Sequence, residues 1–235
     1  ALFHTYRDTS DTTASIIIEE DGTGDPTLKF LTTGVQDWSI GIDNSDSDTF
    51  KIGRGSDSVS GNSKLVLDNN SRISLSNNAF SGDSNNTTFG AGCGEDLASG
   101  ATFNCFMGHQ AGKEEDEGDH NTAFGSTAYA ANGTHTASSY NTCIGSASGH
   151  NMGTGGAAER NTAVGYASLT ALTTADDNVA IGANSADAIT TGGENIAIGT
   201  AAAGALTTGT GNVCVGYAAM TAANATEATN IAIGR

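Results

Sequence analysis

Acidic and histidine side chains gather in the run KEEDEGDH at residues 113–120, with His109 before it and His120 at its end. Clustered carboxylates could hold Ca²⁺, and a pair of histidines could hold a transition metal. The run DNSDSD at residues 43–48 offers alternating oxygen ligands but lacks the Gly and the closing Glu of a calcium loop. A solvated acidic turn explains the first run without a ligand. We therefore expect no metal and no cofactor at either place.

Catalytic motifs are absent from the sequence, which contains no GxSxG, no HExxH and no Gly-rich loop that joins a strand to a helix and is followed by a lysine. Two distant carboxylates could still cleave a polysaccharide, but such chemistry needs aromatic side chains to hold sugar rings. Tyr166 and Tyr217 are the best placed aromatics for that role. The sequence favours a protein that is not an enzyme, with no catalytic residue to name.

Charge and hydropathy exclude two classes of partner. The chain has 235 residues, nine of them Lys or Arg, and a net charge of −17. So few basic side chains argue against a nucleic acid or an anionic membrane surface as a partner. No run of about 18 apolar residues is present, so we expect no membrane insertion. Because Ala1 is not an initiator Met and Arg235 directly follows a motif glycine, we interpret the chain as a segment of a longer protein.

An internal repeat dominates residues 86–235. The pattern is Asn, two variable residues, a large apolar residue and Gly, and its spacing is 17 to 20 residues. The repeat positions are Asn86, Gly90, Asn104, Gly108, Asn121, Gly125, Asn141, Gly145, Asn161, Gly165, Asn178, Gly182, Asn195, Gly199, Asn212, Gly216, Asn230 and Gly234. Each copy predicts a short strand that begins one coil of a β-solenoid, followed by a small-residue stretch and polar turns. We expect an all-β protein with about nine coils.

Side-chain alternation divides each predicted strand into two faces. The residues one and three after the motif Asn share a face and are mostly Thr, Val, Ile or Phe. We predict that this face is the interior of the coil. The residue two after the Asn is mostly Ala, and together with the Gly it forms a face that we expect to pack against identical chains, most simply around a threefold axis. The alternative is that the small face looks inward in a solenoid too narrow for larger side chains.

The motif Asn has a structural interpretation. At the turn that enters the strand it could adopt the left-handed conformation, and stacked Asn side chains could form a ladder from coil to coil. We expect this role rather than a catalytic one.

The predicted solenoid limits which of the cysteines could form a disulfide; these lie at positions 93, 105, 143 and 214. Cys143 and Cys214 occupy the same strand position four coils apart, about 19 Å at ~4.8 Å per coil, which is too far for a disulfide. Cys93 and Cys105 lie at different phases of adjacent coils, so a bridge there is possible but disfavoured. We expect all four to act as small buried hydrophobes.

The copies NVAIG, NIAIG and NTAVG resemble the repeats of YadA-like heads of trimeric autotransporter adhesins and of bacteriophage tail fibres. The 17-residue spacing and the sequence NTAVGYASLTAL are more similar to the phage fibre repeats than to the adhesin repeats. The resemblance implies a homotrimeric left-handed β-roll that serves as a fibre or an adhesive head. It extends to the stretch from DWSIGID to RISL, which looks like the modules that precede such repeats.

Residues 14–76 predict a separate antiparallel β module. Short alternating runs are separated by turn residues and predict strands; they are ASIIIEE, TLKFLTT, DWSIGID, DTFKIGR, KLVLD and RISLS. A small sandwich is expected here, and neighbouring chains could complete it. Residues 1–13 are interpreted as an extended lead-in, 77–85 as a linker and 86–235 as the repeat domain.

These expectations define three functional hypotheses. The first is a homotrimeric phage tail fibre on the virion tail, which contacts other tail proteins and attaches to a host receptor, either a glycan or a protein. Recognition would then lie in the turns at 113–120, 132–140 and 150–160, where loops project. The second is a bacterial adhesin head at the cell surface. The third is a polysaccharide-degrading spike.

Overall fold

The computed structural model describes residues 18–31, 37–54, 63–67, 73–75, 85–97, 100–114, 117–131, 137–221 and 226–234. The chain divides into two compact units, Ala1–Ser76 and Asn77–Arg235. The described residues form β-strands and one short 3-10 helix, and they form no α-helix. The predicted all-β class is therefore confirmed.

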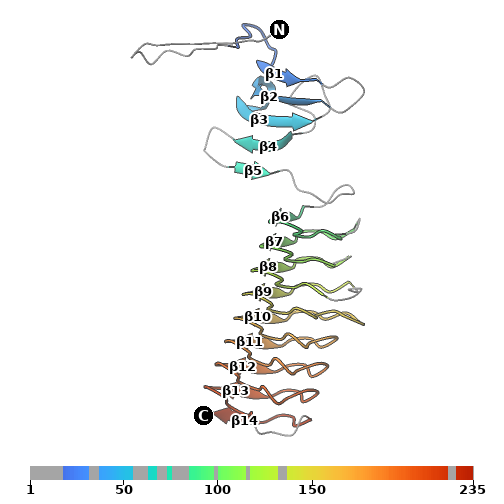
Figure 1. Ribbon diagram of the computed structural model, residues 1–235, viewed down its shortest axis with the longest axis vertical. Helices are drawn as coiled ribbons and strands as arrows, with labels where there is room; N and C mark the ends of the chain where they lie inside the picture. The colour runs from blue at the N-terminus through green and yellow to red at the C-terminus, as the bar shows by residue number, and fades with distance from the viewer. Residues whose placement is uncertain are drawn as a thin grey trace, which may run out of the picture. The chain divides into compact units, whose positions relative to one another are not determined.

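The first unit is a single antiparallel sheet whose five strands follow chain order (Figure 1). Its elements are β1 (Thr27–Phe30), β2 (Trp38–Asp43), the 3-10 helix η1 (Asn44–Asp46), β3 (Thr49–Arg54), β4 (Ser63–Leu67) and β5 (Ile73–Leu75). The run ASIIIEE was expected to be a further strand, but Ile18–Glu20 lie outside any strand and residues 14–17 lie outside the described part of the chain. Within the described residues the unit is one sheet, and a second sheet of a sandwich does not occur.

This sheet buries its polar face. Ser39, Asp43, Thr49 and Lys51 are each at most 6% exposed, and the Lys51 Nζ donates to Asp43 Oδ2 at 2.8 Å. The opposite face is apolar across neighbouring strands, since Leu28 pairs with Ile40, Ile40 with Ile52 and Ile52 with Leu65. The exposed large apolar side chains of this face are Leu28, Phe30, Trp38 and Leu67, and the exposed Arg54 lies at its edge opposite Trp38. An apolar face that stays exposed indicates a surface built to be covered.

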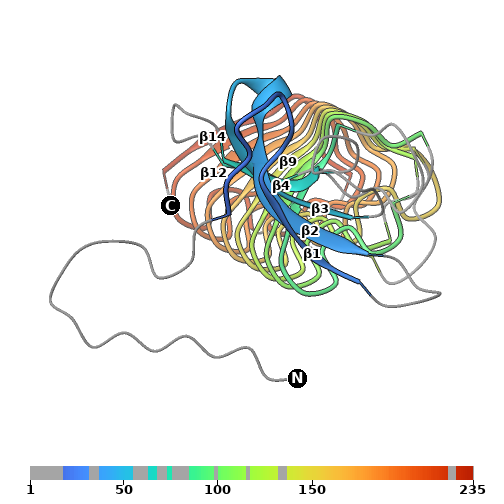
Figure 2. The same cartoon turned by 90° about the horizontal axis from the view of Figure 1, so that it is seen from above.

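The second unit is a β-solenoid, as predicted. Nine three-residue strands form one parallel sheet in which neighbours along the chain are neighbours in the sheet (Figures 1 and 2). They are β6 (Thr87–Phe89), β7 (Cys105–Met107), β8 (Thr122–Phe124), β9 (Thr142–Ile144), β10 (Thr162–Val164), β11 (Val179–Ile181), β12 (Ile196–Ile198), β13 (Val213–Val215) and β14 (Ile231–Ile233). Equivalent motif positions pair, so that Ala163 lies opposite Ala180 and Ala180 opposite Ala197. The repeat length in the sequence thus becomes one coil.

Each coil contains one strand, and its remaining described residues form turns. The interior is filled from two sides. The residue two after the motif Asn points inward from the strand, as Ala180 and Cys143 do, and both are fully buried. Facing side chains come from the position eleven after the Asn, and they are Leu97, Met152, Leu172, Ile189 and Leu206. Together with buried residues of the turns, such as Tyr129 and Leu169, these side chains form one continuous core.

The motif asparagines form an unbroken ladder through the interior of the solenoid. In every one of the steps from Asn86 to Asn230, the side-chain Oδ1 of one Asn accepts from the backbone N–H of the next, at 2.7–3.1 Å. The Nδ2 of Asn161 also donates to Ala175 O at 2.8 Å, on the far wall of its own coil. Each Asn therefore satisfies buried backbone groups within its coil and between coils.

The left-handed conformation lies one residue before the Asn, not at the Asn as expected. The residues at this position have positive φ throughout, and they are Phe103, His120, Tyr140, Arg160, Asp177, Glu194, Gly211 and Thr229. The Asn itself must begin the strand because its N–H takes part in the ladder. The preceding residue therefore makes the turn.

Candidate functional site

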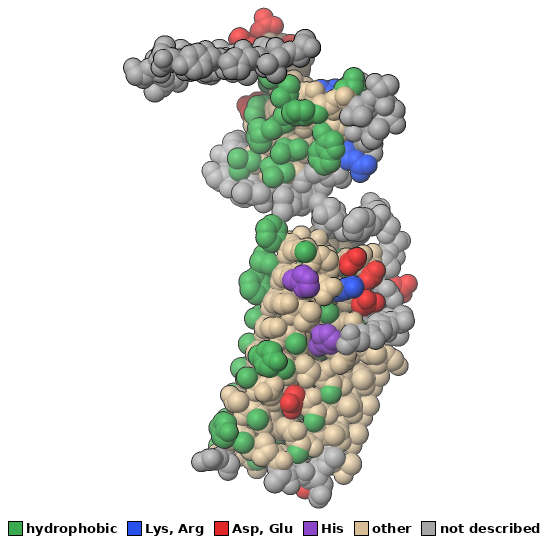
Figure 3. Space-filling view, viewed as in Figure 1, with side chains coloured by type: hydrophobic (Ala, Val, Ile, Leu, Met, Phe, Trp, Pro, Cys, Tyr) green, Lys and Arg blue, Asp and Glu red, His purple; other side chains and the backbone are tan. Residues whose placement is uncertain are grey.

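Large apolar side chains line the outward face of the solenoid strands, and hydrophobic side chains follow that edge of the unit in Figure 3. At the position three after the motif Asn, 60% of Phe89, 39% of Ile181 and 77% of Ile233 are exposed. We call this face the apolar strip. It consists of Phe89, Met107, Phe124, Ile144, Val164, Ile181, Ile198, Val215 and Ile233, with Val179, Ile196, Val213 and Ile231 at the position one after the Asn, all exposed or half-buried.

The prediction that these residues fill the coil interior is wrong, because the two faces are exchanged. Ala163, Ala180 and Ala197 are fully buried inside the coil, while their neighbours in the strand point outward. The cause is the width of the coil. In the coils that begin at Asn141, Asn161, Asn178 and Asn195, the side chain eleven residues after the Asn already occupies the interior, and the residue opposite it is Cys or Ala. The second coil differs, because it buries Phe106 at the inward strand position. The narrow-solenoid alternative is the correct one.

The Ala and Gly face is consequently not a surface for another chain. The motif glycines instead bring successive coils together, with φ between +119° and +143°. A Cβ built on Gly182 would lie 2.6 Å from the carbonyl carbon and oxygen of Gly199. The motif glycines from Gly90 to Gly216 are therefore required by the neighbouring coil within the same chain.

Three aromatic rings stack on the surface where successive coils turn into their strands. The Phe103 and His120 ring centroids are 4.9 Å apart with planes 11° from parallel, and those of His120 and Tyr140 are 5.2 Å apart with planes 6° from parallel. Phe103 is 53% and Tyr140 57% exposed. We call these residues the aromatic column. Its geometry is offset stacking, which holds the rings in place at the surface.

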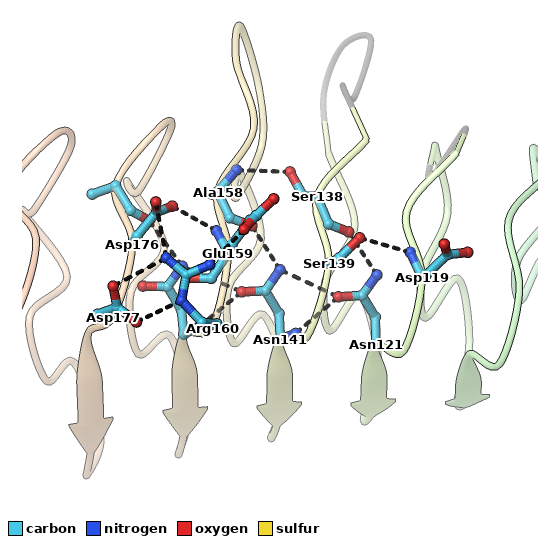
Figure 4. A network of polar contacts seen from close by, with 12 residues as sticks. Asp119, Asn121, Ser138, Ser139, Asn141, Ala158, Glu159, Arg160, Asp176 and Asp177 are labelled. Carbon is cyan, nitrogen blue, oxygen red and sulfur yellow. Dashed lines mark hydrogen bonds and ion pairs between the residues drawn. The ribbon is translucent and has the colours of Figure 1, made fainter.

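Arg160 occupies the same position one coil beyond Tyr140 and is held by carboxylates (Figure 4). Its Nε donates to Asp177 Oδ1 at 2.8 Å, and Nη2 reaches Asp176 Oδ2 at 3.3 Å. Nη1 pairs with Glu159. The hydrogen bonds that Arg160 donates to Asp177 lower the pKa of the Asp177 carboxyl below its ordinary value. The same bonds, with the one that Arg160 donates to Glu159, raise the pKa of the guanidinium. The side chains of this cluster are fixed although they are exposed.

The carboxylate of Asp119 is also positioned by its neighbours. Its Oδ1 accepts from the backbone N–H of Thr102 at 2.6 Å and from the Thr102 hydroxyl at 2.8 Å. The backbone N–H of Asp119 donates to Ser139 Oγ at 3.0 Å, which is drawn in Figure 4. Asp119 therefore links three coils beside the aromatic column.

The two runs considered as metal sites have other contacts in the structure. In the acidic turn Lys113 pairs with Glu114 at 3.7 Å, and residues 115–116 lie outside the described part. His109 follows the motif Gly of its strand, whereas His120 precedes the next motif Asn and belongs to the aromatic column. In the other run, the Asp43 carboxylate is held by Lys51. Among the described residues no group of three or more His, Cys, Asp and Glu is arranged to hold a metal ion.

The cysteines and the tyrosines singled out in the sequence are dispersed. All four cysteines are free thiols; Cys143 and Cys214 are buried as expected, but Cys105 is exposed because it lies on the outward face of β7. Tyr166 and Tyr217 are 62% and 60% exposed, yet they lie in turns that follow β10 and β13, which are three coils apart. The structure therefore brings neither Cys143 and Cys214 nor the two tyrosines together.

The aromatic column is the feature that the sequence analysis missed. A signal for it exists, because aligning the copies on the motif Asn places Phe103, His120 and Tyr140 in one column directly before it.

Within the described residues no helix has the length and apolar character needed to span a membrane. Comparisons with protein-family models, curated proteins and solved structures find no match to this chain.

Proposed function

We propose that this chain belongs to a non-enzymatic, homotrimeric attachment fibre of the bacteriophage tail-fibre type, carried on the virion tail. The observation that supports it is the apolar strip, which runs along every strand of the solenoid. Contiguous exposed apolar surface of more than a few hundred Å² marks an interaction surface in a soluble protein. The strip contains no charged residue, as is typical of the centre of an interface.

The size of the strip suits contact between chains. At their exposures, its side chains would each remove roughly 50–100 Å² of accessible area when covered, which gives about 800 Å² or more per chain, the amount each partner buries in a stable interface. A second copy of the chain fits best as the partner. An identical solenoid lying parallel presents apolar side chains with the same spacing from coil to coil, so contacts repeat along the whole strip.

The first unit supports the same proposal independently. Its sheet exposes Leu28, Phe30 and Trp38 on the apolar face and buries its polar face. Three copies held together through the solenoid would also bring three such sheets near one another, because each sheet belongs to the same chain as its solenoid. Their apolar faces could then cover one another, which would complete between chains the sandwich expected from the sequence.

Attachment by such a fibre would rest on multivalent contact. Three chains in one fibre, and several fibres on one particle, raise the effective concentration of each binding site and turn weak contacts with a host glycan or protein into durable attachment. The proposal assigns no catalytic step to the chain. Release of oligosaccharides from host polysaccharide by the purified protein would contradict it.

The experiment that tests this function compares two charge substitutions for assembly and for adsorption to bacterial cells. Ile181→Glu together with Ile198→Glu places carboxylates on the strip, while Thr200→Glu places one on an exposed position beside it. We expect the first variant to become monomeric and to adsorb more weakly to cells that the wild type binds, with Thr200→Glu unchanged in both assays. A trimeric double variant would refute the role of the strip.

A further inference from the structure

The position occupied by the aromatic column does not require aromatic residues. All coils from the second onward place a residue with positive φ there, and other coils use Asp177, Glu194, Gly211 and Thr229. Packing therefore leaves the residue type free. Three rings on successive coils expose apolar area that the fold does not need, which points to a ligand rather than to folding.

The rings are ordered before any ligand arrives. Offset stacking between Phe103 and His120, and between His120 and Tyr140, restricts the side-chain rotamers of all three. A ligand that contacts the column would lose little affinity to side-chain ordering. The column extends over three coils, so it suits a chain of several small rings better than a single one.

Polar groups beside the column are equally fixed. Asp119 is held by Thr102 and Ser139, and the Arg160 cluster with Glu159, Asp176 and Asp177 continues the row. Carboxylates held next to these rings can accept hydrogen bonds from hydroxyl groups, while the parts of the rings that stacking leaves exposed contact C–H groups. A ligand with both features on each unit is a sugar.

Charge narrows the class of sugar. The carboxylates near the column outnumber the one cation of this cluster, Arg160, and the chain carries a net charge of −17. Acidic polysaccharides and nucleic acids would be repelled by this surface. Uncharged pyranose rings carry no such penalty.

We propose that the aromatic column and the polar row beside it form a binding ridge for uncharged pyranose oligosaccharides. The inference rests on the proposed function and names the chemical class of the host receptor. It also accounts for the three turns in which recognition was expected, because these turns end at His120, Tyr140 and Arg160.

The test is binding of the purified full chain to an array of short uncharged oligosaccharides built from hexoses and N-acetylhexosamines, followed by calorimetry on the sugars that bind. The variant Phe103→Thr with Tyr140→Thr removes the outer rings and uses the residue that Thr229 places at the equivalent position. Tyr166→Thr is the matched control, since Tyr166 has a similar exposure and Thr200 occupies its equivalent position in another coil.

The wild type should bind at least one uncharged oligosaccharide, the double variant at least about tenfold more weakly, and the control within about twofold of the wild type. All three proteins should contain the same number of chains per assembly, as judged from the molecular mass in solution. Absence of binding by the wild type, an equal loss in both variants, or a changed mass of the double variant would each overturn the inference. The last result would assign the column to contact between chains.

Failure of this inference and failure of the proposed function are distinguishable. If the wild type is a trimer that adsorbs to cells but binds no uncharged sugar, the binding ridge is refuted and the fibre proposal stands. If the wild type is a monomer, the proposed function is refuted, whatever the result of the oligosaccharide array.

Discussion

Ala180 and Ile181 are adjacent in β11 and face opposite sides of the coil wall. Ala180 is fully buried, whereas 39% of Ile181 is exposed. The same division recurs in the neighbouring strands, where Ala197 and Cys214 are buried and Ile198 is exposed. The solenoid thus keeps a thin core inside and carries its larger apolar side chains outside.

Enlarging the interior residue should be more harmful than shortening the outer one. Ala180→Leu adds volume opposite a filled wall and should lower the free energy of unfolding by about 1–3 kcal/mol. Ile181→Ala should leave the far-ultraviolet circular dichroism of the chain unchanged, because it removes atoms that do not contribute to the core. Urea denaturation measures the first effect, and an Ala180→Leu variant as stable as the wild type would contradict the orientation of the strand.

Close approach of coils at the motif glycines gives a second prediction. Gly182→Ala forces a Cβ against the Gly199 carbonyl, while at Gly234, which has φ of +119°, nothing among the described residues lies within 4 Å. Both substitutions carry the backbone cost of positive φ, but only the first adds the clash. Gly182→Ala should be at least about 2 kcal/mol more destabilising than Gly234→Ala in thermal denaturation. A similar melting temperature for both would show that the coils do not meet there.

Interrupting the Asn ladder should destabilise the solenoid. Asn161→Ala removes the acceptor of the Asn178 N–H and the donor to Ala175 O, and it leaves two buried backbone groups to be satisfied otherwise. We expect a loss of about 3 kcal/mol in the free energy of unfolding. Thr200→Ala, on the exposed surface, should change it by less than about 0.5 kcal/mol. Hydrogen exchange would also show faster exchange at the Asn178 amide in the first variant alone.

Acidification should lower the stability of the first unit through protonation of Asp43. Burial raises the pKa of the Asp43 carboxyl, but hydrogen bonds from Lys51 and Ser45, with the charge of Lys51, outweigh it and leave the pKa below the ordinary value of 3.8. Because the folded-state pKa is the lower one, the carboxylate stabilises the sheet above pH ~3.8, and this stabilisation is lost as the pH falls below it.

Fluorescence of Trp38, the only tryptophan in the sequence, reports on this unit. Asp43→Asn should lower the stability of the sheet by about 3 kcal/mol at neutral pH, since it removes the carboxylate that binds the buried Lys51. It should also abolish the loss of stability below pH ~3.8. An unchanged acid transition in the variant would mean that another group is responsible.

The coil architecture could be predicted from the sequence because its signal is local and repeated. Nine copies of Asn and Gly at nearly constant spacing fix where each strand begins and how strands pair. The same logic predicted the strands from Thr27 to Leu75, where turn residues separate alternating runs.

The orientation of the strands could not be predicted, because alternation defines two faces without saying which is inward. Both faces of the copy NVAIG are apolar, so hydrophobicity gave no answer. The deciding contact comes from Ile189 and its equivalents, eleven residues after the motif Asn, which already fill the interior. That relation depends on the width of the folded coil and is not present in any single copy.

The aromatic column was missed for a related reason. Phe103, His120 and Tyr140 lie 17 and 20 residues apart, and they become neighbours only when the copies are stacked. Tyr166 and Tyr217 drew attention because they follow the motif glycine, but three coils separate them.

The most direct measurement of the central claim is the molecular mass of the purified chain by sedimentation equilibrium over a range of concentrations. If the outward apolar side chains are covered by identical chains, the mass should be three times the 23.5 kDa of one chain. A mass of 23.5 kDa at every concentration would contradict the claim, since those side chains would then remain exposed to water.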